Sequence, residues 1–329
     1  MDNVSVVIPT RNRPENIEKL LNSVLKQTTN PKEVIIVDDS DDLKTKSLYH
    51  KMETTFLCKN ILLKYTRGRE KNSSIGAARN IGVEQAKGSV ILFADDDVIL
   101  DRHGIEQILN CYRRHPDALG VSGYISYFGR VDFFSNPSSI FPGFRSFLFN
   151  AFRKVFSLPH MEKGKQRILH SGHVTFPYML TEESNVDWMS GIFSSYKAEV
   201  LRFFKFDERL IKYSLWEDVD LPSRVTRRYP NSLYMTPFAK AVHEKSPFAR
   251  RSARLLTYTL VGYHIYFFFK DMPQNLLNRL AFAWSWVGMF LMRLCLRDMK
   301  NLILLVRAYL YTLSHFAEIV NGRFPFLYW

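Results

Sequence analysis

The stretch "VILFADDDVIL" (residues 90–100) places Asp95, Asp96 and Asp97 between two apolar runs. The first run is typical of a buried strand, and three adjacent carboxylates at its end repel one another. Asp is common in turns, so a turn is one interpretation of this triplet. The other is a site for Mg²⁺ or Mn²⁺, which bind through carboxylates together with substrate phosphates.

Short apolar runs alternate with helical patterns before the triplet. The predicted strands are 4–10, 33–39, 61–67 and 89–94, and the predicted helices are 13–27, 41–57 and 76–88, the last closed by Gly88. Nearly all-apolar strands separated by helices predict an α/β fold with a mostly parallel sheet that is covered on both faces. Ligands of such sheets bind beyond the carboxyl ends of the strands.

Polar and charged residues gather at these predicted strand ends. They are Pro9, Thr10 and Arg11 after the first strand, Asp38 and Asp39 after the second, Arg67 after the third, and the Asp triplet after the fourth. Since all four groups should meet along one rim, the pattern favours a shared ligand site over four unrelated turns.

Length and composition limit the classes of protein. The chain has 329 residues, 46% of them hydrophobic and 23% charged, which predicts a globular protein with one large domain and an appendage, or with two domains. Three widely spaced cysteines without a CxxC pair argue against a disulfide framework or a zinc site and fit a reducing compartment. The start, "VSVVIP", has no basic leader, so secretion is not expected.

The formal net charge is +13, and residues 250–329 hold ten Lys or Arg against three acids. Such an excess suits nucleic acid, an anionic membrane surface or phosphorylated ligands, and composition alone does not separate these.

Five blocks, in this order and spacing, resemble the family 2 glycosyltransferases, which are inverting enzymes with the GT-A fold. The blocks are "VSVVIPTRNRPENIEKLLNSVLKQ", "EVIIVDDSDD", "SIGAARNIGVEQAKGSVILFADDDV", "WMSGIFSSYKAEVL" and "WEDVDLPSRV". The resemblance covers roughly residues 3–245. It implies a GT-A catalytic domain at 1–248, with a nucleotide-binding half (1–125) and an acceptor half (126–248), followed by a helical region at 249–329.

On the donor side the resemblance implies an Asp-X-Asp metal motif. Asp97 is predicted to contact Mn²⁺ or Mg²⁺ directly, and Asp95 to reach the metal or the ribose. Asp39 is predicted to accept from the nucleobase, which suits uracil, thymine or guanine. The donor is therefore expected to carry UDP, dTDP or GDP, and the loop "SDD" after Asp39 departs from the family's usual pattern, which leaves the nucleotide open.

Further donor contacts are predicted around this motif. Pro9, Thr10 and Arg11 would lie along the base and ribose, Gly76 would let the backbone approach, and Asp96 is grouped with them without an assigned role. Arg67 and Arg79 are candidates for base or diphosphate contacts, and Arg79 has the alternative of a salt bridge to one of the aspartates.

The block "WEDVDL" supplies the predicted catalytic base. We expect Asp218 to take the acceptor's proton, with Glu217 as the alternative. A structural alternative is helix capping, with Ser214 as N-cap and Glu217 at N3.

Three further positions complete the predicted site. Gly191 is predicted to admit the donor sugar, and Trp188 either stacks on it or belongs to the core. His243 is predicted either as a third metal ligand or as a structural histidine.

The last eighty residues lie outside the family pattern. The apolar runs 255–269 and 280–296 are too short, or interrupted by Arg293, to predict a transmembrane helix. If residues 276–320 form helix in one phase, their basic residues share one stripe, with Trp284, Trp286 and Tyr309 among the apolar residues; the stripe comprises Arg279, Arg293, Arg297, Lys300 and Arg307. This pattern favours a membrane interface over a homo-oligomer, and "FPGFRSFLFNAFRKVF" (141–156) is a second amphipathic candidate.

Together these patterns predict an inverting, metal-dependent glycosyltransferase. It would move a sugar from a nucleoside-diphosphate sugar to an acceptor hydroxyl of a lipid-linked (polyprenyl carrier) glycan at the cytoplasmic face of the membrane. The alternatives are a soluble oligomeric transferase that extends a polysaccharide and a non-catalytic nucleotide-sugar-binding relative. Nucleic-acid binding is disfavoured because the positive charge coincides with apolar surface.

Overall fold

The computed structural model describes residues 3–68, 74–127, 144–212, 215–244 and 252–328. The chain divides into two compact units, which are described separately below.

One break between the units falls between residues 248 and 249, at the predicted boundary, but residues 130–179 separate from the rest of the predicted catalytic domain. Unit 1 comprises residues 1–129 and 180–248, and unit 2 comprises residues 130–179 and 249–329. Part of the predicted acceptor half therefore groups with the C-terminal helices. The functional assignment of each part stays a prediction.

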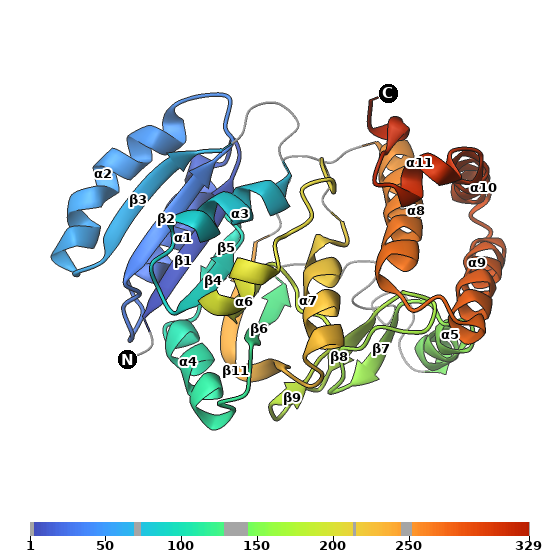
Figure 1. Ribbon diagram of the computed structural model, residues 1–329, viewed down its shortest axis with the longest axis horizontal. Helices are drawn as coiled ribbons and strands as arrows, with labels where there is room; N and C mark the ends of the chain where they lie inside the picture. Colours follow the sequence, from blue (N-terminus) through green and yellow to red (C-terminus); the bar gives the residue numbers. More distant parts are fainter. Residues whose placement is uncertain (1–2, 69–73, 128–143, 213–214, 245–251, 329) are drawn as a thin grey trace. The chain divides into compact units, whose positions relative to one another are not determined.

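Unit 1 holds a nine-stranded sheet within the described residues (Figure 1). Its strands are β1 (Val4–Thr10), β2 (Glu33–Asp38), β3 (Leu62–Arg67), β4 (Val90–Ala94), β5 (Val98–Leu100), β6 (Gly120–Tyr127), β9 (Ser184–Asn185), β10 (Phe193–Lys197) and β11 (Leu233–His243). They run in the order β3-β2-β1-β4-β10-β6-β11-β5, and β9 pairs with β11. The first four are parallel to one another, whereas β10 is antiparallel to its neighbours β4 and β6.

The helices of unit 1 lie between these strands in the chain. They are α1 (Pro14–Val24), α2 (Lys44–Cys58), α3 (Ile75–Gln85), α4 (Gly104–Arg114), α6 (Ala198–Phe203) and α7 (Glu217–Arg228). The four predicted strands agree with β1 to β4 within one residue at each end. The predicted third helix was wrong at its end, because Ala86 is already extended (ψ 135°) and α3 does not reach Gly88. A Cβ at Gly88 would lie 2.6 Å from the carbonyl oxygen of Asn3, so this glycine allows close chain approach.

Successive side chains of β1 point to opposite faces of the sheet, and both faces are covered by apolar packing. Val6 and Ile8 belong to one apolar cluster together with Ile17 of α1, whereas Val7 belongs to a second cluster together with Ala78 of α3. All seven residues of β1 are buried. This is the pattern that near-continuous apolar strands predict for a central parallel strand.

The carboxyl ends of the parallel strands meet at one edge, as predicted. Thr10 of β1 lies beside Asp38 of β2, which lies beside Arg67 of β3. The backbone N–H of Asp39 donates to the carbonyl of Thr10 at 2.9 Å. The polar residues at these strand ends are thereby brought to one rim of the sheet.

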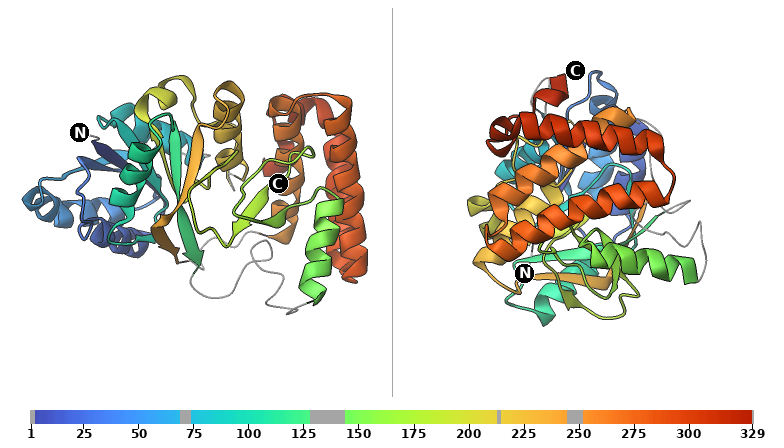
Figure 2. Two further views of the ribbon diagram at one scale, coloured as in Figure 1. Left: turned by 90° about the horizontal axis from the view of Figure 1, so that it is seen from below. Right: turned by 90° about the vertical axis from the view of Figure 1, so that its right-hand side faces the viewer.

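Unit 2 joins a small sheet to a group of helices. Its elements are α5 (Phe144–Val155), the parallel pair β7 (His160–Lys163) and β8 (Thr175–Tyr178), α8 (Ala253–Asp271), α9 (Leu276–Cys295), α10 (Met299–Ser314), α11 (Phe316–Val320) and the 3₁₀ turn η2 (Pro325–Tyr328). Helix α10 packs against both α8 and α9 (Figure 2). Among the described helices, none combines the length and apolarity that crossing a bilayer requires.

The predicted continuous stripe of basic residues is wrong. Helix α9 ends at Cys295, Arg297 has a left-handed backbone (φ 53°), and Asp298 caps the separate helix α10. The break interrupts the helical phase on which the predicted stripe relied, and Arg293 is paired with Asp298 at 2.9 Å.

The predicted set of aromatic residues at an interface is only partly exposed. Trp286 packs on Tyr309 with ring centroids 4.2 Å apart, and Tyr309 is buried, whereas Trp284 is exposed. The ring of Trp284 stacks on Phe156, just beyond α5. Of the predicted amphipathic segment 141–156, the first three residues lie outside the described residues.

Candidate active site

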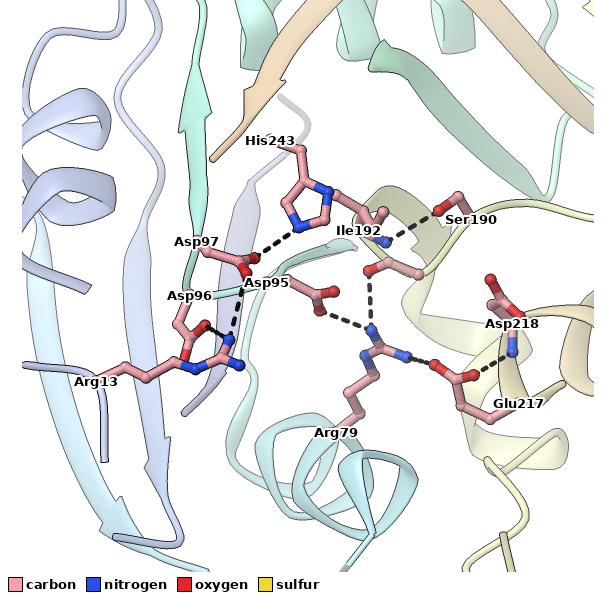
Figure 3. A network of polar contacts seen from close by, with 11 residues as sticks. Arg13, Arg79, Asp95, Asp96, Asp97, Ser190, Ile192, Glu217, Asp218 and His243 are labelled. Carbon is pink, nitrogen blue, oxygen red and sulfur yellow. Dashed lines mark hydrogen bonds and ion pairs between the residues drawn. The ribbon is translucent and has the colours of Figure 1, made fainter. Parts of the chain in front are cut away.

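Two arginines organise the carboxylates at the rim of unit 1. Arg13 follows β1, and Arg79 projects from α3 toward the Asp triplet and the start of α7 (Figure 3). Each guanidinium joins two carboxylates, as the following contacts show.

Arg79 lies at the centre of the network. Its side chain is 1% exposed, Nη1 donates to Glu217, and Nη2 donates to Asp95 Oδ1 and to the carbonyl of Gly191, both at 2.9 Å. A buried guanidinium with two carboxylate partners matches the salt-bridge alternative for Arg79.

Gly191 serves this arginine. A Cβ at Gly191 would lie 2.5 Å from Nη2 of Arg79, well inside contact distance. The guanidinium therefore accounts for a glycine at this position, and the predicted place of the donor sugar beside Gly191 stays a prediction.

Asp96 faces the protein. Its Oδ2 accepts from Thr10 Oγ1 at 2.8 Å and its Oδ1 accepts from Arg13 Nη1 at 2.9 Å. Both oxygens are thus engaged, and the side chain is buried. Asp96 therefore fixes the end of β1, a structural role that the sequence did not assign. The hydroxyl group of Thr10 is engaged in this hydrogen bond.

Asp97 meets His243 at the end of β11. Nε2 of His243 lies 2.9 Å from Asp97 Oδ1, while Asp97 Oδ2 accepts from Arg13 Nη1 at 3.3 Å. Burial opposes protonation of the imidazole, but the hydrogen bond and charge of Asp97 outweigh it and raise the pKa of His243. The two predicted metal ligands are therefore adjacent.

The residues at this point fit a hard divalent cation. A carboxylate and an imidazole converge, and Asp95 is near enough for its charge to raise the pKa of His243 as well. The ligand atoms of all three residues are nevertheless not within 4.8 Å of one another. Among the described residues, the group that meets this distance is Cys111, His115 and Glu183.

The Cys111 group is an ion-pair network. Arg114 donates to both oxygens of Glu183, at 2.5 and 3.0 Å, and His115 Nε2 lies 3.0 Å from the same carboxylate. Burial raises the pKa of the Cys111 thiol, which opposes formation of a thiolate ligand.

The helix α7 begins with the predicted catalytic pair. Trp216 is its N-cap, with a left-handed backbone (φ 74°) and no side-chain cap, so Glu217 is the first helical residue. The predicted capping box with Glu217 at N3 is therefore wrong, and Ser214 lies outside the described residues. A strained non-glycine backbone of this kind is often found at functional sites.

Glu217 and Asp218 are in different surroundings. Glu217 is paired with Arg79 and also accepts from the backbone N–H of Asp218 at 2.6 Å. Burial raises the pKa of both carboxyls, to about 6 for Asp218, and the ion pair with Arg79 opposes this rise at Glu217. We regard the Arg79 contact as keeping Glu217 ionised, because a buried guanidinium favours a charged partner.

The carboxylate of Asp220 forms an ion pair within α7. Its Oδ2 accepts from Arg224 at 2.7 and 3.1 Å, one turn along α7. Among the three acids in the first turn, Glu217 and Asp220 each have an arginine partner, which distinguishes Asp218 as the candidate base.

The predicted nucleotide residues form a second group along the rim. Asp39 lies against Gly68, where a Cβ would come within 1.8 Å of Asp39 Oδ1. Arg67 is half-exposed with Nη1 3.8 Å from Asp38, and Arg11 is exposed beside Asp41. Pro9 is buried within β1.

Two predicted donor residues lie in the protein interior. Gly76 is buried in α3, where a Cβ would come 3.1 Å from Cβ of Phe206. Trp188 is 5% exposed, which agrees with its core alternative. Their packing explains these two residue types.

Sequence reasoning missed Arg13. The residue sits at the N-cap position of α1, where a side chain that accepts a hydrogen bond is preferred, and Pro14 follows. A basic residue at such a position, three residues beyond a strand that ends at the rim, was the available signal. Its partners could not be named before the loop geometry was known.

Comparisons with known proteins relate the chain to glycosyltransferases. The pattern described as "Glycosyl transferase family 2" matches residues 5–180, more than half of the chain. Glycosyltransferase AglE of Haloferax volcanii is 38% identical over 97 residues, which cover 29% of this chain and 30% of that protein. A glucosyl-dolichyl phosphate glucuronosyltransferase of the same organism is 29% identical over 124 residues, 37% of this chain and 38% of that protein.

A third relative is also represented by solved structures. The poly(ribitol-phosphate) β-N-acetylglucosaminyltransferase TarS of Staphylococcus aureus is 31% identical over 128 residues, 36% of this chain and 21% of that protein. The structure of its residues 1–349 in complex with UDP-GlcNAc superposes with a TM-score of 0.57 at 17% identity, covering 97% of this chain and 81% of that chain. This likeness confirms the predicted fold class. The matched stretches span about a third or less of the curated relatives' lengths.

Replacing Arg79 tests the central ion pairs. Arg79→Met should lower the free energy of unfolding by about 3–5 kcal/mol at pH 7.5, because two buried carboxylates lose their partner. Burial raises the pKa of these carboxyls in the folded variant above their values in the unfolded state. The folded variant therefore takes up protons first, and the loss in free energy of unfolding should become smaller as the pH falls toward 5. Urea unfolding at both pH values measures this.

Arg202→Met is the matched control, because Arg202 is exposed on α6, and it should change stability by less than about 0.5 kcal/mol. A loss for Arg79→Met that is small, or equal at both pH values, would contradict the assignment.

Proposed function

Because this chain belongs to glycosyltransferase family 2, we propose that it transfers a sugar from a nucleoside-diphosphate sugar to an acceptor hydroxyl, with inversion at the anomeric carbon. The observation that carries the proposal is the convergence of Asp97 and His243 with the Arg79-linked pair Asp95 and Glu217 beside Asp218 (Figure 3). Donor-side and acceptor-side groups thus share one rim.

We assign the proton transfer to Asp218. Inversion requires one base that removes the acceptor proton as the oxygen attacks opposite the leaving group. Burial raises the pKa of Asp218 to about 6, which suits a base at neutral pH. Glu217, held by Arg79, would orient the start of α7.

Asp97 and His243, with Asp95, would hold Mn²⁺ or Mg²⁺. A divalent cation supplies Lewis acidity toward a departing nucleoside diphosphate. Asp39 would accept from the N–H of uracil, thymine or guanine, with Arg67 and Arg11 at the exposed side of the same rim. Arg79, buried between Asp95 and Glu217, would support these groups from within the protein.

The acceptor assignment rests on unit 2. An apolar stripe runs along α9 and α10, with side chains between 37% and 63% exposed at steps of three and four residues within each helix; it comprises Leu277, Leu280, Trp284, Val287, Leu291 and Leu294, then Met299, Ile303, Val306, Leu310 and Leu313. Large apolar side chains exposed repeatedly along a helix mark an interaction site.

Charge selects the partner for this apolar stripe. Steps of three and four residues suit helix packing between copies, but two copies would bring together the basic excess of residues 250–329. Anionic lipid headgroups complement exposed Arg279, Lys300 and Arg307 while the stripe enters the interface. We therefore favour a peripheral site on the cytoplasmic membrane face and a lipid-linked glycan acceptor. A soluble oligomer acting on a polysaccharide is the alternative.

The nucleotide and metal assignments can be tested by binding. UDP, dTDP and GDP should be compared in thermal unfolding with and without Mn²⁺, and one of them at 100 times its Kd should stabilise by about 2.7 kcal/mol. Asp97→Asn should remove the metal-dependent part, whereas exposed Asp117→Asn should not. The metal assignment is wrong if no nucleoside diphosphate stabilises the protein, or if the stabilisation is the same without Mn²⁺ and in Asp97→Asn.

The catalytic base can be tested by kinetics. Asp218→Asn should lower kcat by about 10²–10⁴-fold, the usual contribution of a general base, with little change in nucleotide affinity. In the wild type, kcat/KM should fall as pH drops through about 6, because the base must be ionised. If Asp218→Asn still transfers sugar, and its kcat/KM falls at the same low pH as that of the wild type, another residue is the base.

The apolar stripe can be tested with vesicles. The variant Leu291→Glu with Leu310→Glu should lose flotation with phosphatidylglycerol-containing liposomes, because both charges would enter the lipid interface. Phe203→Glu, at an exposed apolar position of unit 1, is the control and should float as the wild type does. If the double variant floats as the wild type does, the membrane assignment is wrong. If the wild type is an oligomer and the double variant is a monomer, the soluble oligomeric alternative is favoured.

A further inference from the structure

Arg13 takes the place of a cation at Asp97. Its Nη1 lies 2.9 Å from Asp96 Oδ1 and 3.3 Å from Asp97 Oδ2 (Figure 3). The guanidinium is three-quarters buried and bridges two adjacent carboxylates that would otherwise repel each other. Burial lowers the pKa of Arg13, but the charges of Asp96 and Asp97 outweigh it, so the group stays charged.

The two carboxylates hold Arg13 unequally. Asp96 has the shorter contact, and its other oxygen is fixed by Thr10 at 2.8 Å, so it acts as an anchor built into the end of β1. Asp97 has the longer contact to Arg13, and its other oxygen meets His243. Asp97 is therefore the carboxylate that can exchange Arg13 for another cation while Arg13 keeps Asp96.

We propose that Arg13, anchored by Asp96, is an internal competitor of the divalent cation for Asp97, and that it makes metal binding depend on the donor diphosphate. The inference rests on the metal site proposed above. A cation at Asp97 alone would face the guanidinium's positive charge a few ångströms away, which is unfavourable. A diphosphate supplies the negative charge that lets both cations remain. Arg13 is thus a positioning residue.

Electrostatic competition of this kind predicts the direction in which the metal affinity changes when Arg13 is removed. Coupling between two ligands of a protein is commonly 5–150-fold in affinity, and here removal of Arg13 should strengthen metal binding. A residue that merely supported the loop would have the opposite effect, since its loss would disorder the ligands.

The test is a Mn²⁺ titration of the full chain without donor, followed by the loss of the free-ion electron paramagnetic resonance signal. Arg13→Gln should bind Mn²⁺ about tenfold more tightly than the wild type, and the gain in Mn²⁺ affinity on adding UDP should shrink. Arg13→Lys, which keeps the charge, should stay near the wild type. Arg102→Gln controls for bulk charge, because Arg102 is exposed, and should leave the affinity unchanged.

The outcomes separate this inference from the metal assignment. If the wild type and Arg13→Gln both fail to bind Mn²⁺, with and without UDP, the metal site is wrong and the inference falls with it. If the wild type binds Mn²⁺ and Arg13→Gln binds equally or more weakly, the competition alone is overturned. Should Arg13→Gln fail to fold, Asp96→Asn replaces it: releasing the anchor should turn Arg13 toward Asp97 and weaken Mn²⁺ binding, and unchanged binding would overturn the inference.

Discussion

The ion pairs of Arg79 are the interaction on which the rest of the site depends. One buried guanidinium joins Asp95, at the end of a central strand, to Glu217, at the start of α7, and also holds the carbonyl of Gly191. These three positions come from distant parts of the chain. Without this cation, several carboxylates would face one another at low dielectric, at a cost of several kcal/mol. The arginine therefore makes it possible to concentrate negative charge where a metal and a diphosphate are proposed to bind.

Much of the framework follows from local pattern. Strands β1, β2 and β4 are mostly apolar and, with β3, alternate with helices, and such a pattern has few solutions other than a parallel sheet with a polar rim. The positions of the Asp triplet and Asp39 at strand ends follow from the same rule, whereas His243 was predicted only from the family resemblance. These features depend on the spacing of residues within one element, which the sequence displays directly.

Pairings across the fold could not be read in the same way. The roles of Gly191 and Asp96 depend on where Arg79 and Arg13 point, and a side-chain direction is set by tertiary packing. The start of α7 was misplaced because Ser214 suggested a cap, whereas the left-handed backbone of Trp216 begins the helix. The basic stripe failed for a related reason: the break at Arg297 and Asp298 interrupts the helical phase on which that prediction relied.

The contact between Arg79 and Gly191 has an evolutionary consequence. The space that a Cβ at position 191 would need is filled by the guanidinium, and the carbonyl of Gly191 satisfies one of its donors. We therefore expect the two positions to vary together among relatives, although 112 residues separate them in the chain. Relatives that carry a side chain at the position of Gly191 are expected to carry a shorter residue at the position of Arg79, together with a different way of neutralising Glu217.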